Sequence, residues 1–533
     1  MWQCVGIRFF ITMMDRDEFD VIAGLNHSGV DIMSSLHEQA MNYVYQQVLQ
    51  RLLSYFNRAE RTALQLLIQR LVVAAGGIDR IGHYKVLVAF SGGKDSAYTV
   101  ALLRAAQLSI AGRGPETFSL RIANMRHPGM TSAVMDNINR CYSALFLHDD
   151  PRVELLVVDH QYVQTFEPDL PFSIAGREQS RSDMLLGGHL TAGDARTTFC
   201  NSCYLGMAEF LGRAACWRDG VDAVLSGDSL KEQKQYATWI MRLARRNGQE
   251  VADWHTLSFS SALHTIDTVG RAYYRELYGE DTQPAGSMRR PMGYPIKPVS
   301  PTFLTLVDLI GFRLEDHWPL LTDFLGFRFD DLAFSFSESD CANPLLMAHM
   351  RGLRAEFVQG RNYADGIHEY LELAAAMMRR KRMPRRLIVQ AMAAYDDPDK
   401  LDERRALAAG YAQEAFGLSE VQLVCLLFAP FVDAGAQLEP FLRRCHPGML
   451  VAQGDLHKAL AGQPAPDQVV QWLVEVSGLS LKGLQNLYAK RRVDFSDDSS
   501  LIARVRASDP DKGRVVTIDP KTGETVSELV SGR

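Results

Sequence analysis

The sequence predicts an α/β protein with a central parallel sheet and helical extensions at both ends. Four short apolar stretches recur through the middle of the chain, and residues with helical spacing separate each stretch from the next. This alternation of strand and helix is typical of parallel sheets connected by right-handed crossovers. Long amphipathic patterns lie before and after these stretches, and they predict the helical extensions.

The first extension is expected to cover residues 1–80 and to be mostly helical. Apolar residues recur at helical spacing through 36–75, and Gly76 and Gly77 follow directly, as expected at the end of a helix.

The sheet is expected within residues 81–344. Its predicted strands are 85–90, 118–124, 153–159 and 221–226. A polar insert at 160–198, rich in Gly, Ser and Arg, separates the third strand from the fourth. We expect this insert to be a loop or lid near the functional site.

A helical C-terminal domain is expected at 345–490, followed by a polar tail at 491–533. The stretch "RVVTIDPKTGETVSEL" within the tail favours a β-hairpin with its turn at 520–523, and a flexible tail is the alternative.

Composition restricts the class of protein. A chain of 533 residues, 47% hydrophobic and 23% charged, is typical of a globular protein with two or three domains. The net charge of −6 provides no overall positive field to attract nucleic acid. Eight cysteines are too few for a disulfide framework in a chain of this length. We therefore expect a cytoplasmic protein that does not insert into membranes.

The most informative stretch is "KVLVAFSGGKDSAYTVALLRAA", residues 85–106. An apolar run ends in a glycine-rich turn, and a helical pattern then resumes. Two glycines allow the chain to take conformations closed to other residues, and their N–H groups converge with the positive end of the helix dipole. This combination predicts a phosphate cradle formed by Ser91, Gly92, Gly93 and Ser96. Lys94 would add a positive charge for the phosphate, and Asp95 would lie in the first helical turn.

Cysteines form a second signal. Cys200 and Cys203 form a CxxC pair at the start of a predicted helix, where the helix dipole favours the thiolate. That helix leads into the strand at 221–226, which is followed by Gly227 and Asp228. Because ligands bind at the carboxyl ends of parallel strands, the CxxC pair and Asp228 are expected to face the same crevice as the glycine-rich loop.

The hexapeptide SGGKDS, residues 91–96, resembles the PP-loop of the ATP pyrophosphatase superfamily (adenine nucleotide alpha hydrolase-like proteins). The resemblance implies a doubly wound parallel sheet that binds ATP and Mg²⁺. It also implies that a substrate oxygen is adenylated and pyrophosphate is released. Carried over onto this chain, it assigns phosphate binding to residues 91–96, nucleotide contacts to Asn124 and Gly227, and metal binding or orientation to Asp95 or Asp228.

The order of the motifs resembles two branches of that superfamily. A PP-loop, a CxxC pair, Asp228 and a later Cys341 resemble the tRNA 2-thiolation enzymes, in which three cysteines hold a [4Fe-4S] cluster that carries sulfur. The resemblance makes Cys200, Cys203 and Cys341 the candidate ligands, and the CxxC pair the group that delivers sulfur. More loosely, the chain resembles N-acetyl sugar amidotransferases, which also combine a PP-loop with an internal CxxC.

Several alternatives stay open. The metal could be zinc, with His160 or His264 as a further ligand, or the CxxC pair could carry a persulfide or be incidental. A thiolating enzyme would need a sulfur donor, and an amidating enzyme would need ammonia from a partner protein. The substrate could be a small molecule, a peptide or a tRNA. A non-catalytic ATP-binding scaffold is the alternative from another class.

Overall fold

The computed structural model describes residues 39–114, 116–159, 162–199, 203–226, 230–249, 258–279, 301–306, 309, 317–328, 344–380, 385–507, 512–518 and 525–531.

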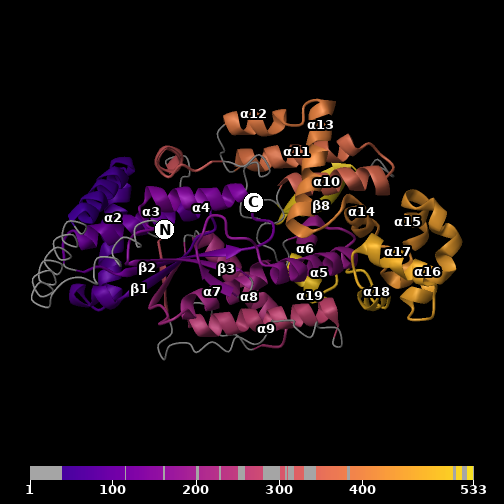
Figure 1. The fold of residues 1–533 in the computed structure, drawn as a ribbon, viewed down its shortest axis with the longest axis horizontal. Coiled ribbons are helices and arrows are strands. Elements are labelled where there is room, and N and C mark those ends of the chain that lie inside the picture. Colours follow the sequence, from indigo (N-terminus) through magenta and orange to yellow (C-terminus); the bar gives the residue numbers. More distant parts are fainter. Residues whose placement is uncertain are drawn as a thin grey trace, which may run out of the picture.

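A six-stranded, mostly parallel sheet lies between helices (Figure 1). Its strand order is β4-β3-β2-β1-β5-β6. Its strands are β1 (Lys85–Ala89), β2 (Ser119–Arg126), β3 (Val153–Asp159), β4 (Tyr162–Thr165), β5 (Ala223–Ser226) and β6 (Thr302–Thr305). Neighbouring strands are parallel except for β3 and β4. The four predicted strands are confirmed, and β4 and β6 extend the sheet at its two edges.

Helices precede the first strand and connect most of the strands that follow. A helical segment over 39–55 precedes α2 (Arg58–Ala74), α3 (Lys94–Ala111), α4 (Ser132–Ala144), α5 (Ile174–Leu190), α6 (Ala195–Phe199), α7 (Cys203–Cys216), α8 (Leu230–Arg246) and α9 (Phe259–Tyr278). The C-terminal region is helical, as predicted, and contains α10 (Pro344–Leu353), α11 (Tyr363–Arg380), α12 (Arg385–Ala393), α13 (Pro398–Tyr411), α14 (Glu420–Phe428), α15 (Leu438–Cys445), α16 (Gln453–Leu460), α17 (Asp467–Ser477), α18 (Leu481–Tyr488) and α19 (Leu501–Ala507).

Alternate residues of the strands supply two separate apolar clusters, one on each face of the sheet. Val86 and Val88 of β1 belong to the cluster that includes α2, α3 and α4. Leu87 belongs to the opposite cluster, which includes α5, α7 and α9. Because successive side chains of a strand point to opposite faces, the near-continuous apolar run of β1 is explained by helices on both sides.

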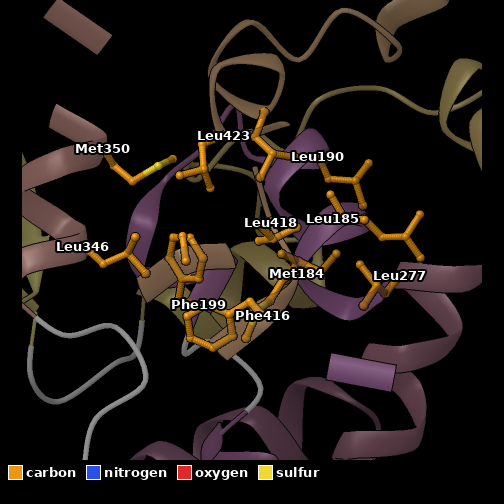
Figure 2. Packing of buried hydrophobic residues seen from close by; sticks show 14 of the residues in the cluster. Met184, Leu185, Leu190, Phe199, Leu277, Leu346, Met350, Phe416, Leu418 and Leu423 are labelled. Carbon is orange, nitrogen blue, oxygen red and sulfur yellow. The ribbon is translucent and has the colours of Figure 1, made fainter. Parts of the chain in front are cut away.

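The cluster on the second face continues into the C-terminal helices without a break. Figure 2 shows Phe199 at the end of α6 next to Phe416, whose ring centroid lies 5.5 Å away. Leu423 of α14 and Leu346 of α10 belong to the same cluster. The C-terminal helices and the sheet are therefore parts of one core.

The insert at 160–198 is not the predicted loop or lid. It contains β4, α5 and α6, and the C-terminal half of α5 is buried. Arg181 of the insert forms hydrogen bonds with the C-terminal region. It donates from Nε to Gly417 O at 3.0 Å and from a terminal nitrogen to Gly478 O at 2.9 Å. The arginines that suggested a loop bind carbonyl groups at the ends of C-terminal helical segments.

The tail contains the predicted hairpin, because β7 (Lys512–Ile518) and β8 (Thr525–Ser531) pair antiparallel. The predicted turn at 520–523 lies outside the described residues. Helix α19, which the sequence did not predict, is buried through Leu501, Ile502 and Val505. No described helix is both long enough and apolar enough to cross a membrane.

Candidate functional site

The strand, glycine-rich loop and helix predicted at 85–106 are confirmed. β1 ends at Ala89, and α3 begins at Lys94 with Gly93 as its N-cap. Phe90 still pairs with the sheet, since its N–H donates to Ala123 O at 2.9 Å. The loop therefore leaves the sheet at Ser91 and enters a helix N-terminus three residues later.

Gly92 adopts a backbone conformation that requires glycine. Its φ is +78°, and a Cβ atom at this position would lie 2.7 Å from Val134 Cγ1 and 3.0 Å from Ile138 Cγ1. A side chain would thus be strained and would collide with α4. The loop lies directly against that helix.

Two serines close the loop with short-range hydrogen bonds. Ser91 Oγ and Ser96 Oγ are 3.0 Å apart, and Ser96 Oγ also donates to Gly93 O at 3.0 Å. The Gly93 N–H donates to Ser91 Oγ across a longer 3.3 Å. These bonds hold both serine hydroxyls beside the first turn of α3, where backbone N–H groups favour an anion.

Lys94 and Asp95 differ in exposure. Lys94 is only 8% exposed, whereas Asp95 is exposed in the first turn of α3. Burial of an ammonium group is costly unless an anion compensates it. Asp95 benefits from the positive end of the α3 dipole and is accessible to a cation.

The strand order places this loop at a reversal of the sheet. From β1 the chain proceeds to β2 and β3 on one side, and later places β5 and β6 on the other. β1 and β5 are parallel, with Val88 opposite Leu225, so both end at the same edge. Such reversals are where open α/β sheets bind ligands. Gly227 and Asp228 follow β5 in the sequence and lie outside the described residues.

Asn124 is buried at the end of β2 next to the loop, and both ends of its side-chain amide have protein partners. Its Nδ2 donates to Phe90 O at 2.5 Å, and its Oδ1 accepts a hydrogen bond from the Tyr142 hydroxyl at 2.7 Å. The nucleotide contact by Asn124 stays a prediction, and its side chain connects β2, the start of the loop and α4.

The cysteine cluster stays a prediction. Helix α7 begins at Cys203, as expected, and leads into β5. Cys200, Cys341 and the Cys203 side chain lie outside the described residues, and so does His160. The preceding helix α6 is packed into the core, because Phe199 is 2% exposed and contacts Phe416.

One neighbour of the site could not be found by sequence reasoning. Tyr411, at the end of α13, donates its hydroxyl hydrogen to Gly129 O at 2.6 Å. Gly129 lies between β2 and α4, beside the carboxyl edge of the sheet. Because 282 residues separate the two partners, no local pattern signals this contact between the C-terminal helices and the site.

Comparison with protein-family models, with curated proteins and with solved structures finds no match to this chain.

Proposed function

We propose that the protein is an ATP pyrophosphatase with a doubly wound sheet, which binds ATP at residues 91–96 and adenylates a substrate oxygen. The observation that carries this proposal is the SGGKDS loop at the reversal of a parallel sheet, directly before a helix N-terminus. A nucleotide phosphate would meet the backbone N–H groups of the α3 N-terminus, the two serine hydroxyls and the buried Lys94.

The chemistry follows from charge and position. A phosphate near Lys94 would pair with its ammonium group, and Asp95 would be a ligand for Mg²⁺, which would supply further positive charge to the phosphates. The substrate oxygen attacks the α-phosphorus, the bond to the bridging oxygen of pyrophosphate breaks, and pyrophosphate leaves. AMP then becomes the leaving group for a second nucleophile. Fixed positive charge and correct placement supply most of the catalysis in such transfers.

We further propose that the second nucleophile is sulfur, delivered by the cysteines at 200 and 203 and with Cys341 as a third ligand of a [4Fe-4S] cluster. The supporting observation is that α6 and α7 flank the CxxC pair and lead into β5, the neighbour of β1. Soft thiolate ligands suit such a cluster, which would supply an exchangeable position for sulfur. The alternatives are zinc as the metal, ammonia as the nucleophile, and a non-catalytic ATP-binding scaffold.

The phosphate site is tested by Lys94→Ala and Asp95→Ala. Each variant is expected to abolish ATP–pyrophosphate exchange, measured with candidate substrates, because each removes a charge used in the transition state and leaves the core intact. Val451→Ala is the control, because the Val451 side chain is 96% exposed. Its rate of ATP–pyrophosphate exchange should equal that of the wild type. Exchange at wild-type rates in both loop variants would contradict the phosphate assignment.

A further inference from the structure

Helix α4 presents one continuous row of side chains to the phosphate loop. Val134, Ile138 and Tyr142 are four residues apart, so they lie on the same face of the helix. All three are 0% exposed. Nothing in the loop's own sequence signals that a helix 40 residues later supports it.

The first two members of the row support Gly92. A Cβ at Gly92 would come within 2.7 Å of Val134 and 3.0 Å of Ile138, so the loop backbone rests on these two side chains. Such a close approach fixes the distance between the loop and α4, because interiors of proteins are packed at the density of organic crystals.

The third member acts through Asn124. The Tyr142 hydroxyl donates to Asn124 Oδ1 at 2.7 Å, and Asn124 Nδ2 donates to Phe90 O at 2.5 Å. The rings of Tyr142 and Phe90 also contact, with centroids 5.7 Å apart. Burial raises the pKa of the Tyr142 hydroxyl well above its ordinary value, so the hydroxyl remains a donor.

We propose that α4 is the support that holds the phosphate loop in its binding shape before nucleotide arrives, with Tyr142 and Asn124 as positioning residues. This inference rests on the proposed ATP site. Phe90 O is fixed at one end of the loop by Asn124, and Gly92 is fixed two residues later by Val134 and Ile138. Holding a loop in its bound conformation removes the ordering cost that the ligand would otherwise have to offset.

Tyr142→Phe tests the proposal, because it keeps the ring and removes only the hydroxyl. Hydrogen exchange of the amides at 90–96 is measured in the ligand-free protein, and the dissociation constant for MgATP is measured by titration. Loss of one buried hydrogen bond is expected to accelerate exchange and weaken MgATP binding, each about tenfold. Ile138→Val, which removes one methyl group beneath Gly92, should change both quantities in the same direction by a smaller factor.

Tyr363→Phe is the matched control, since the Tyr363 hydroxyl bonds His349 Nδ1 at 2.8 Å among the C-terminal helices. It should lower thermal stability as Tyr142→Phe does, without changing loop exchange or MgATP binding. Wild-type exchange in the loop of both Tyr142→Phe and Ile138→Val would overturn the proposal. Faster hydrogen exchange of the loop amides in Tyr142→Phe with unchanged MgATP affinity would also overturn the proposal. A wild-type protein that binds no MgATP would instead overturn the proposed function, and loop exchange would still decide whether α4 supports the loop.

Discussion

Burial keeps three of the described cysteines protonated. Cys141 and Cys425 are 2% and 0% exposed, and burial raises the pKa of both thiols. Burial likewise raises the pKa of Cys445 to about 11. A thiol that stays protonated is a poor nucleophile and a poor metal ligand. These three cysteines contribute to packing, and the cysteines at 200, 203 and 341 remain the candidates for metal binding.

Single alanine substitutions of these candidates test the metal site. If Cys200, Cys203 and Cys341 share one metal, each substitution should remove most of the bound iron or zinc, because a site with three protein ligands tolerates no loss. The measurement is the iron, zinc and sulfide content of protein purified without oxygen.

Cys425→Ala is the control for the metal measurement. It should retain the metal and lower the free energy of unfolding by about 1 kcal/mol through lost packing. Full metal content in Cys341→Ala, with loss in the other two variants, would remove Cys341 from the site. A wild-type protein without metal would exclude the cluster.

Helix α19 shows how the N-terminus of a short helix is capped by one carboxylate from another element. Glu276, near the end of α9, accepts a hydrogen bond from Ser500 Oγ and another from the Leu501 N–H, both at 2.6 Å. These bonds satisfy donors at the N-terminus of α19, and the negative charge complements its dipole. Arg506 then pairs with Asp194 at 3.2 Å and connects α19 to the start of α6.

Glu276→Ala is expected to release α19. The free energy of unfolding should fall by about 1–2 kcal/mol, the cost of losing a helix cap. Amides of 501–507 should exchange faster. Glu439→Ala is the control, because Glu439 pairs with Arg443 on an exposed helix surface, and such pairs contribute about 0.5 kcal/mol or less. Equal losses of stability in the two variants would contradict a specific role for Glu276.

Elements differ in how far the sequence predicts them. β1 and α3 were predictable because their signal is local: a β-prone run, two glycines and then helical spacing. α5 was not, because its arginines bind carbonyls more than 200 residues away, such as Gly417 O and Gly478 O. A prediction from neighbouring residues alone therefore treats those arginines as exposed to solvent.

The candidate site also has one part that its local sequence predicts and another part that depends on contacts between distant elements. The loop residues 91–96 follow from their own sequence, whereas the support from Tyr142 through Asn124 depends on how three elements assemble. The contact between Tyr411 and Gly129 depends on the whole chain, because it forms only when α13 reaches the sheet.

At the scale of the whole molecule, two buried histidines make stability depend on pH. Burial lowers the pKa of His189 to about 3 and that of His349 to about 4, from an ordinary value of 6.5. Both are neutral in the folded protein and take up protons on unfolding in mild acid. Their contribution to stability is therefore complete above pH 6.5 and is lost as the pH falls toward 4 for His349 and toward 3 for His189.

Thermal unfolding between pH 7.5 and 4.5 should show this loss. In that window each histidine adds a slope of up to about 1.4 kcal/mol per pH unit. Asp150, whose pKa is lowered to about 2 by hydrogen bonds and charge from Arg152 and Arg104 despite its burial, acts only below this window. His349→Gln should flatten the profile, and His264→Gln, at an exposed position, should not. Identical profiles for all three proteins would contradict the assignment.

The shared core has a consequence for synthesis on the ribosome. α5 packs against α14, where Gly188 and Gly193 approach Leu426 and Leu427 so closely that a Cβ would collide. About 230 residues separate α5 from this partner, which corresponds to roughly 10–50 s of translation at about 5–20 residues per second. During that interval α6 and α9 can already pack against α5, but the part of α5 that α14 covers has no native partner. The apolar residues that α14 covers in the finished protein therefore stay exposed until α14 has left the exit tunnel.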